Sequence, residues 1–273
     1  MSSETRPNDS VTRRSFMAVL AAISGGLWLR PTPAAAMAAQ AQRTAAGPAA
    51  ENLVEDLAVA YRILAQERVF DTGGHMSVRR DASHFLSAWR RAPELVTPDD
   101  ILEHDLDGKV INSKGHTLNS ERFIHAEIYR ARPDVNAIVH AHTPSIILFS
   151  LGTIPLEPIL DDAVFLGAGV PIFKAGEAGG GANNPEVGRA LAQTLGKSAV
   201  ALLRGHGFVV VASSVGQVIQ RAKYLNLNAQ LQAQALAMGS KPPYLRAPAN
   251  AGDGDAGTYE REWEAWRRRA QFK

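Results

Sequence analysis

Residues 136–145, "NAIVHAHTPS", place two histidines at the end of an apolar run that is typical of a buried strand. Successive side chains of a strand point to opposite faces, so His140 and His142 are expected on one face, with Ala141 between them pointing away. Two neutral imidazoles arranged in this way can bind one metal ion and leave room for a third protein ligand. Two partly buried histidines satisfied by ordinary hydrogen bonds would explain this pair equally well when it is taken alone.

A third histidine, His206, lies between two glycines in the apolar segment "LLRGHGFVVVA", which is expected to form a strand. Glycine inside a strand marks a bulge or a close approach by another group, so a histidine there can point at a ligand. With His140 and His142 it would supply three nitrogen donors, the number used by catalytic zinc and related first-row metal sites with an open position. The chain has no cysteine, so any metal must be held by His, Asp, Glu or water.

Hydrophobic spacing along the chain predicts helices that alternate with strands and hairpins. Strands are expected in a hairpin formed by residues 75–80 and 84–89, and again near 136–142, 171–174 and 199–212. Helices are expected over residues 51–70, 121–132, 185–196, 215–239 and 259–272. Because hairpins occur among the strands, this order favours a three-layer α/β/α fold with a central mixed, mostly antiparallel sheet over a doubly wound parallel sheet.

The first 38 residues have the features of an export signal. Arg13 and Arg14 precede an apolar stretch over residues 18–29, and Ala36-Met37-Ala38 offers a small-x-small cleavage pattern. This resembles a twin-arginine signal peptide, which predicts a periplasmic protein without stable membrane insertion after cleavage. An uncleaved anchor is the alternative. Residues 39–50, rich in Ala, Gln, Gly and Pro, are expected to be a linker.

The charge of the chain gives no support for a nucleic-acid partner. Residues 1–38 contain four arginines and two acidic residues, a net charge of +2, which equals the net charge of the whole chain. The remainder is therefore formally neutral, and the sequence pI of about 9.0 reflects the signal. A small-molecule substrate is the expected partner.

Two segments, residues 120–145 ("SERFIHAEIYRARPDVNAIVHAHTPS") and 202–233, closely resemble the class II aldolase/adducin family, with a resemblance that extends over residues 51–240. The resemblance implies a catalytic domain with a nine-stranded, mostly antiparallel sheet, assembled as a homotetramer with active sites at subunit boundaries. It also implies that His140, His142 and His206 bind one divalent metal ion per subunit (Zn, Mn, Fe or Co). Glu121, at the start of a helix, would be the proton donor or acceptor.

Two departures from the sugar-phosphate aldolases narrow the expected substrate. Their phosphate-binding Gly-Asn and Ser-Gly pairs are replaced here by Gly74-His75 and by "AWRRAPELVTPDD". The chain instead resembles the branch that contains decarboxylases of hydroxylated aromatic or pyridine dicarboxylates, and His75 and Arg79 are the expected substrate-binding residues.

The expected function is therefore that of a metal-dependent carbon–carbon lyase of the aldolase or decarboxylase type, with decarboxylase slightly favoured, acting on a small hydroxy or hydroxy-aromatic carboxylate. Glu121 would need a raised pKa to deliver a proton. A non-haem iron oxygenase and a non-catalytic, adducin-like structural module are the alternatives.

The C-terminal segment, residues 241–273, reads as a polar loop followed by a short charged helix. Tyr259, Trp263 and Trp266 recur on one face of that helix, which predicts that it packs on the domain or on a neighbouring subunit.

Overall fold

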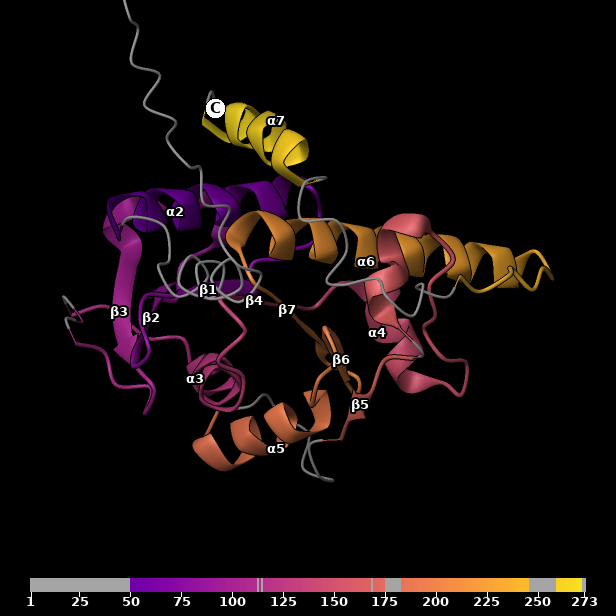
Figure 1. Cartoon of the computed structure of the whole chain (residues 1–273), viewed down its shortest axis with the longest axis horizontal. Helices are drawn as coiled ribbons and strands as arrows, with labels where there is room; N and C mark the ends of the chain where they lie inside the picture. The colour runs from indigo at the N-terminus through magenta and orange to yellow at the C-terminus, as the bar shows by residue number, and fades with distance from the viewer. Residues whose placement is uncertain are drawn as a thin grey trace, which may run out of the picture. The chain divides into compact units, whose positions relative to one another are not determined.

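The computed structural model describes residues 50–111, 113, 115–167, 169–174, 183–245 and 259–271 (Figure 1). The predicted signal peptide, and the predicted linker up to residue 49, lie outside the described residues. Within the described part of the chain, no helix has the length and apolar character needed to cross a membrane.

A seven-stranded sheet in the order β3-β2-β1-β4-β7-β6-β5 forms the centre of the fold. Only the pairing of β5 with β6 is parallel, so the sheet is mixed and mostly antiparallel, as predicted. The described residues form seven strands where the family resemblance implied nine. The strands are β1 (His75–Arg79), β2 (His84–Ala88), β3 (Ile101–Asp105), β4 (Ala137–Ala141), β5 (Ile172–Phe173), β6 (Val200–Leu203) and β7 (Gly207–Ala212).

Helices cover both faces of the sheet, which confirms the three-layer prediction (Figure 1). On one face lie α2 (Ala50–Gln66), α4 (Pro144–Leu151), α6 (Val215–Ala237) and α7 (Tyr259–Gln271). On the other lie α3 (Arg122–Ala131) and α5 (Pro185–Leu195). Short 3-10 turns occur at Pro93–Leu95, Pro98–Asp100 and Asp161–Leu166.

Alternation along β4 decides which face carries the first histidine. Ala137, Val139 and Ala141 belong to the apolar cluster beneath α2 and α6, whereas Ile138 packs in the cluster beneath α3 and α5. His140, two residues after Ile138, therefore faces the α3 side. A slip of one residue would move His140 into the larger apolar cluster and expose apolar side chains whose burial contributes roughly 1.5–3 kcal/mol each. The packing of β4 thus fixes the orientation of His140.

His206 lies in the turn between β6 and β7, and the prediction that it lies inside a strand is wrong. The backbone of Gly205 adopts φ +67°, a left-handed conformation that suits glycine and reverses the chain just before His206. Gly207 serves a different purpose, because a Cβ there would lie 2.2 Å from the carbonyl oxygen of Ala141. The two glycines thus form a tight turn and let it approach the end of β4.

The C-terminal helix α7 packs on α2 and α6 of its own chain. Trp266 is 4% exposed, the Tyr259 ring covers Gly216, and Glu262 accepts a hydrogen bond from the Tyr224 hydroxyl at 2.7 Å. Of the two predicted docking sites for this helix, the structure shows the one on the domain itself.

Candidate active site

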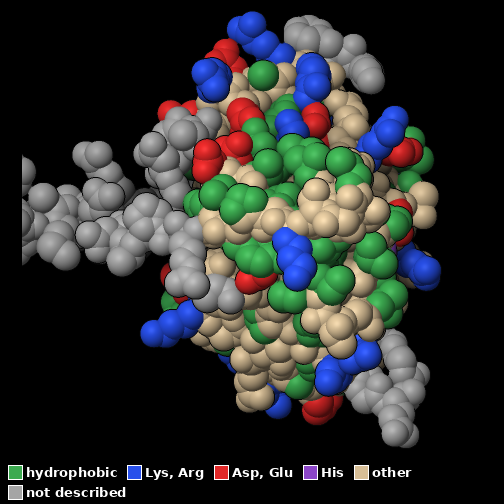
Figure 2. All heavy atoms as spheres, turned by 90° about the vertical axis from the view of Figure 1, so that its right-hand side faces the viewer, with side chains coloured by type: hydrophobic (Ala, Val, Ile, Leu, Met, Phe, Trp, Pro, Cys, Tyr) green, Lys and Arg blue, Asp and Glu red, His purple; other side chains and the backbone are tan. Residues whose placement is uncertain are grey.

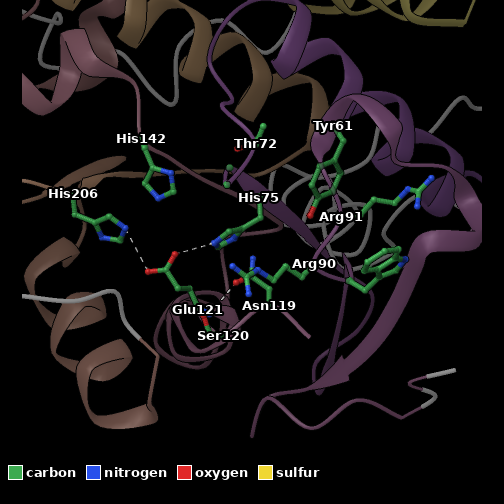
Figure 3. Close-up of a pocket in the computed structure, with 13 residues that line it drawn as sticks. Tyr61, Thr72, His75, Arg90, Arg91, Asn119, Ser120, Glu121, His142 and His206 are labelled. Atoms are coloured by element: carbon green, nitrogen blue, oxygen red, sulfur yellow. Dashed lines mark hydrogen bonds and ion pairs between the residues drawn. The ribbon is translucent and has the colours of Figure 1, made fainter. Parts of the chain in front are cut away.

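Glu121, His140, His142 and His206 form a cluster in which one ligand atom from each residue lies within 4.8 Å of the others. His140 is the last residue but one of β4, His142 comes directly after that strand, His206 comes from the β6–β7 turn, and Glu121 is the N-cap of α3. Figure 3 shows the side chains of Glu121, His142 and His206 pointing toward one another. The structure therefore brings together the three predicted metal ligands and the predicted proton carrier.

Glu121 contacts three imidazoles through its two carboxylate oxygens. Its Oε2 lies 3.4 Å from His140 Nε2 and 3.5 Å from His75 Nε2, and its Oε1 lies 3.6 Å from His206 Nε2. The backbone amide of Glu121 donates to Asn119 Oδ1 at 3.0 Å, which holds the first turn of α3 in place. The carboxylate is thus presented to the cluster from the start of the helix.

Hydrogen bonds fix which nitrogen of two histidines faces the cluster. His140 Nδ1 lies 2.8 Å from the carbonyl oxygen of Phe208, which can only accept, so Nδ1 carries the proton and Nε2 has a free lone pair. His142 Nδ1 lies 3.2 Å from both carboxylate oxygens of Asp71, which gives the same tautomer. A metal-ligating histidine characteristically donates its second ring N–H to a carbonyl or carboxylate in this way.

Four buried atoms of the cluster have no hydrogen-bond partner among the described residues: Glu121 Oε1, His140 Nε2, His142 Nε2 and His206 Nδ1. Leaving even one buried polar atom unsatisfied costs roughly 1–3 kcal/mol, so an unpartnered atom on each of the four residues of one cluster indicates a missing shared partner. Three imidazoles and one carboxylate are a donor set suited to a first-row divalent ion such as Zn, Mn, Fe or Co. The residues therefore fit the divalent metal that the sequence predicts.

The electrostatics of the site correct one expectation. Burial alone would raise the pKa of Glu121, but the contacts with His140 and His75 outweigh it and hold the pKa below its usual range. The pKa of Glu121 is therefore lowered, where a raised pKa was predicted, and the carboxylate is ionised in the free site. Burial lowers the pKa of His206 to about 4, and the neighbouring His140 adds to this effect. His206 is therefore neutral at pH 7 and able to donate a lone pair.

His75 sits at the start of β1, directly opposite His140 in the sheet. Burial lowers its pKa to about 4, against the opposing effect of Glu121, so the ring is neutral. Because the ionised Glu121 accepts from His75 Nε2, the other nitrogen, Nδ1, must accept from His125 Nε2 at 2.7 Å. His125 Nδ1 in turn accepts from the Ser77 hydroxyl at 2.6 Å. These bonds present His75 to the site as a neutral N–H donor.

A pocket of about 290 Å³ opens beside the cluster. Its lining includes His75, Glu121, His142 and His206, together with Tyr61, Trp89 and Arg90, and Figure 3 shows Tyr61 on the side away from His142 and His206. This volume is at the low end of the range for small-molecule sites, which suits a ligand of about one ring.

The comparisons with known proteins agree with this geometry. The family model described as Class II Aldolase and Adducin N-terminal domain matches residues 55–233. The chain belongs to this family. Among curated class II aldolase/adducin relatives, Decarboxylase tropJ of Talaromyces stipitatus is 31% identical over 212 residues, which cover 70% of this chain and 77% of the relative. A 3,4-dihydroxyphthalate decarboxylase of Arthrobacter keyseri is 31% identical over 199 residues, covering 68% and 79%.

Among solved structures, an aldolase II superfamily protein from Pseudomonas syringae superposes with a TM-score of 0.69 at 25% identity, covering 85% of this chain and 97% of that one. The class II aldolase fold is thereby confirmed. The relatives also confirm the predicted enzyme class, a metal-dependent carbon–carbon lyase.

Arg79, predicted to bind substrate in this class II aldolase family member, lies elsewhere. Its Nε donates to the carbonyl of Val135 at 2.8 Å, and its Nη2 donates to the carbonyls of Tyr129 and Arg132, each at 2.9 Å. Arg79 shares a face of β1 with His75 but lies four residues further along, roughly 13 Å away. It therefore stabilises the C-terminal end of α3 and is not among the residues that line the pocket, so its contact with substrate stays a prediction.

Asp71 and Arg90 are site residues that sequence reasoning missed. Asp71 lies in the predicted turn "DTGG", where an acidic residue is ordinary. Burial alone would raise its pKa, but His142 and the backbone amides of Gly73 and Gly74 lower it on balance. Arg90 belongs to "AWRRAPEL", the segment that stands where the sugar-phosphate aldolases have a phosphate-binding pair. That position alone could have indicated a residue of the substrate pocket.

Proposed function

We propose that the chain is a divalent-metal-dependent decarboxylase of a small hydroxylated aromatic carboxylate. The observation that carries the proposal is the cluster of Glu121, His140, His142 and His206, each with an unpartnered buried atom, beside a pocket lined by Tyr61 and Trp89. Two rings favour a flat ligand, since aromatic faces pack well on one another. Relatives named as 3,4-dihydroxyphthalate decarboxylases support the same substrate class.

The chemical difficulty of this reaction is the negative charge that develops on a ring carbon as CO2 leaves. When bound, the metal ion would supply Lewis-acid chemistry that draws charge from the oxygens of a chelating substrate. His140, His142 and His206 would hold it, with their tautomers set by Phe208 and Asp71.

Glu121 carries the proton in our proposal. As an ionised carboxylate it first accepts the proton of the ring hydroxyl that neighbours the departing carboxylate. It then delivers that proton to the ring carbon, the carbon–carbon bond to the carboxyl group breaks, and the bonding electron pair returns to the ring as CO2 departs. His75, a neutral donor to Glu121 Oε2, keeps the carboxylate oriented through both steps.

Replacing Glu121 by Gln tests this assignment. We expect CO2 release from 3,4-dihydroxyphthalate to fall by about 10²–10⁴-fold, because one acid–base group contributes on this scale, while metal content stays near one ion per subunit. Glu127→Gln, on the same helix but outside the pocket, is the control. Full activity of Glu121→Gln would contradict the role. Product formation that requires O2 would instead indicate the oxygenase.

We further propose that the chain is exported to the periplasm by the twin-arginine route after it folds and acquires its metal. The Arg13-Arg14 pattern supports this, and an open three-histidine site would otherwise meet tight-binding copper and zinc outside the cytoplasm. Replacing Arg13 and Arg14 by Lys should leave a folded, metal-containing enzyme in the cytoplasm, whereas Arg6→Lys should not. A stranded form that lacks metal would contradict the proposal.

We also propose that the protein is a homo-oligomer, in keeping with the tetramer that the sequence predicts. Figure 2 shows hydrophobic side chains gathered on the face that includes α4 and part of α6. Five large apolar residues there are at least 37% exposed, which is typical of an interface: Leu148, Leu151, Ile154, Leu227 and Leu231.

Light scattering on purified protein tests the homo-oligomer. The wild type should have the mass of an oligomer, and Leu148→Glu should lower it because a charge is placed in the interface. Leu95→Glu, at an exposed position outside this patch, should not change the mass. A monomeric wild type would contradict the proposal.

A further inference from the structure

Two adjacent arginines line the pocket, but their side chains have different surroundings. Arg91 donates from Nε to the carbonyl of Leu95 at 2.9 Å, lies 3.2 Å from Asp100 Oδ2, and places its guanidinium 5.4 Å from the centre of the Trp89 ring. Arg90 has an exposed side chain, and no carboxylate of the described residues lies within ion-pair distance of it. The Arg91 guanidinium is therefore bound within its own segment, whereas the Arg90 guanidinium is able to bind a ligand.

The backbone around Arg90 is held in place. The amide of Trp89 donates to the carbonyl of Asp100 at 3.1 Å, and the amide of Arg90 donates to the carbonyl of Thr117 at 3.0 Å. The Trp89 indole N–H donates to Asp100 Oδ1 at 2.7 Å, and its ring stacks on His116 with centroids 4.7 Å apart and planes 3° from parallel. The Arg90 side chain therefore extends from a fixed base, which reduces the entropy lost when it binds a ligand.

The direction of the Arg90 side chain is toward the site. Figure 3 shows Arg90 extending across the pocket toward Asn119 and Glu121, whereas Arg91 points away. Surface arginines without a partner are common and usually solvated. This one lines the same small pocket as the metal-binding cluster and extends toward Glu121, so a ligand bound at the cluster would meet the guanidinium beside it.

We propose that Arg90 binds the second carboxylate of the substrate, on the ring carbon next to the one that loses CO2, and so selects aromatic 1,2-dicarboxylates over monocarboxylates. The proposal rests on the proposed function, because it takes the departing carboxylate and its neighbouring hydroxyl to face the metal cluster. A planar guanidinium can donate two parallel hydrogen bonds to one carboxylate, which fixes orientation as well as adding affinity. The pocket volume leaves room for a single ring whose two neighbouring carboxylates face the metal cluster and Arg90.

The role of Arg90 goes beyond attraction of charge. A flat ring held only at the metal end could rotate about its chelating oxygens, and the carbon to be protonated would then move relative to Glu121. Holding the second carboxylate restricts this motion, and misplacement of a reacting atom by about 1 Å can cost on the order of 10²-fold in rate. Arg90 is thus both a specificity-determining and a positioning residue.

Two substrates that differ only in the second carboxylate test the proposal. The compound 2,3-dihydroxybenzoate equals 3,4-dihydroxyphthalate without its second, adjacent carboxylate. We expect Arg90→Met to lower kcat/KM for the dicarboxylate by about 10–100-fold, the usual effect of losing a hydrogen bond to a charged group, and to change that for the monocarboxylate less than about 3-fold. Arg90→Lys should recover part of the loss, because it keeps the charge but not the paired geometry.

Arg80→Met is the matched control, since Arg80 is exposed, pairs with Glu103 outside the pocket, and carries the same charge. It should leave the ratio of the two substrates unchanged. Equal losses on both substrates in Arg90→Met, or no loss on either, would overturn the proposal.

A binding measurement separates the failure of this proposal from failure of the proposed function. Calorimetry with phthalate and with benzoate on the Zn²⁺-loaded protein should show that the wild type prefers phthalate and that Arg90→Met loses the preference. If the wild type cleaves neither dihydroxy compound, the proposed function fails, while the phthalate-to-benzoate ratio still decides the role of Arg90. An unchanged ratio in Arg90→Met would overturn it.

Discussion

Gly207→Ala is expected to damage the metal centre through the backbone, without removing a ligand. The new Cβ would lie 2.2 Å from the carbonyl oxygen of Ala141. Cβ atoms are essentially never found within 3.0 Å of a non-bonded heavy atom. The ends of β4 and β7 must therefore separate by at least about 0.8 Å. Ala141 is paired with Phe208 across these strands, and Phe208 holds His140. The separation therefore moves His206 relative to the other two imidazoles.

The size of this shift sets the expected effects. Metal–ligand distances tolerate about ±0.2 Å, so a shift of about 0.8 Å exceeds the tolerance roughly fourfold. We expect metal affinity to fall at least 10-fold. This is the smallest effect typical of removing a residue that only hydrogen-bonds to a metal ligand. Overpacking of this kind costs about 1–3 kcal/mol, which for a domain of this size lowers Tm by roughly 2–12 °C.

Calorimetric titration of the metal-free protein with Zn²⁺, together with thermal unfolding in chelator, measures both effects. Gly205→Ala is the control on the other side of His206. Its φ of +67° disfavours alanine by about 1–2 kcal/mol, but its Cβ would meet only Leu151 at 3.5 Å, an ordinary contact. It should lose stability and keep metal affinity. If both variants lost metal affinity in proportion to stability, or if Gly207→Ala bound Zn²⁺ as tightly as the wild type, the reasoning would be refuted.

Two further predictions concern carboxylates that bind no substrate. Asp71→Ala should weaken Zn²⁺ binding about 10–100-fold, because His142 loses the acceptor that orients it. Asp71→Asn should lose less Zn²⁺ affinity. Unchanged Zn²⁺ titrations of both variants would exclude this role. Burial would raise the pKa of Asp100, but hydrogen bonds from Thr97 and Trp89, with Arg91 nearby, lower it below the ordinary 3.8. A depressed folded pKa stabilises the fold above pH 3.8, and this stability is lost as pH falls through the folded pKa. Asp100→Asn should therefore unfold at lower urea than the wild type at pH 7, with a difference that shrinks below about pH 4; a constant difference would contradict this assignment.

The histidine pair could be predicted from sequence because its geometry is local. Alternation in a strand places His140 and His142 on one side whatever surrounds them, and the apolar residues before them show that the strand is buried. The turn at His206 could not be predicted in the same way. A glycine on each side of a histidine is compatible with a bulge or with a reversal of the chain, and only the φ of Gly205 distinguishes them.

The surroundings of Arg79 and the pKa of Glu121 could not be predicted from sequence for a common reason, which is that both depend on the position of α3. Arg79 donates to carbonyls at the C-terminal end of α3, which have no partner within the helix. The sequence does not show that this end of α3 contacts β1. The pKa of Glu121 depends on two imidazoles that come from other strands. A buried carboxylate without them would have a raised pKa, as predicted, so the sequence supplied the burial but not the partners.

The division of the pocket between two structural sources explains how one fold can serve different lyase reactions. The ligand set is fixed by the sheet, because β4 and the β6–β7 turn position the three histidines and α3 positions Glu121. Another part of the pocket lining comes from Trp89 and Arg90, which lie outside the sheet core. Hydrogen bonds to Asp100 and Thr117 hold these two residues in place. Substitutions in that wall can therefore change which anionic group the pocket accepts while the ligand spacing stays the same. This separation predicts that exchanging Arg90 alters substrate preference without altering metal affinity, the reverse of the effect expected at Gly207.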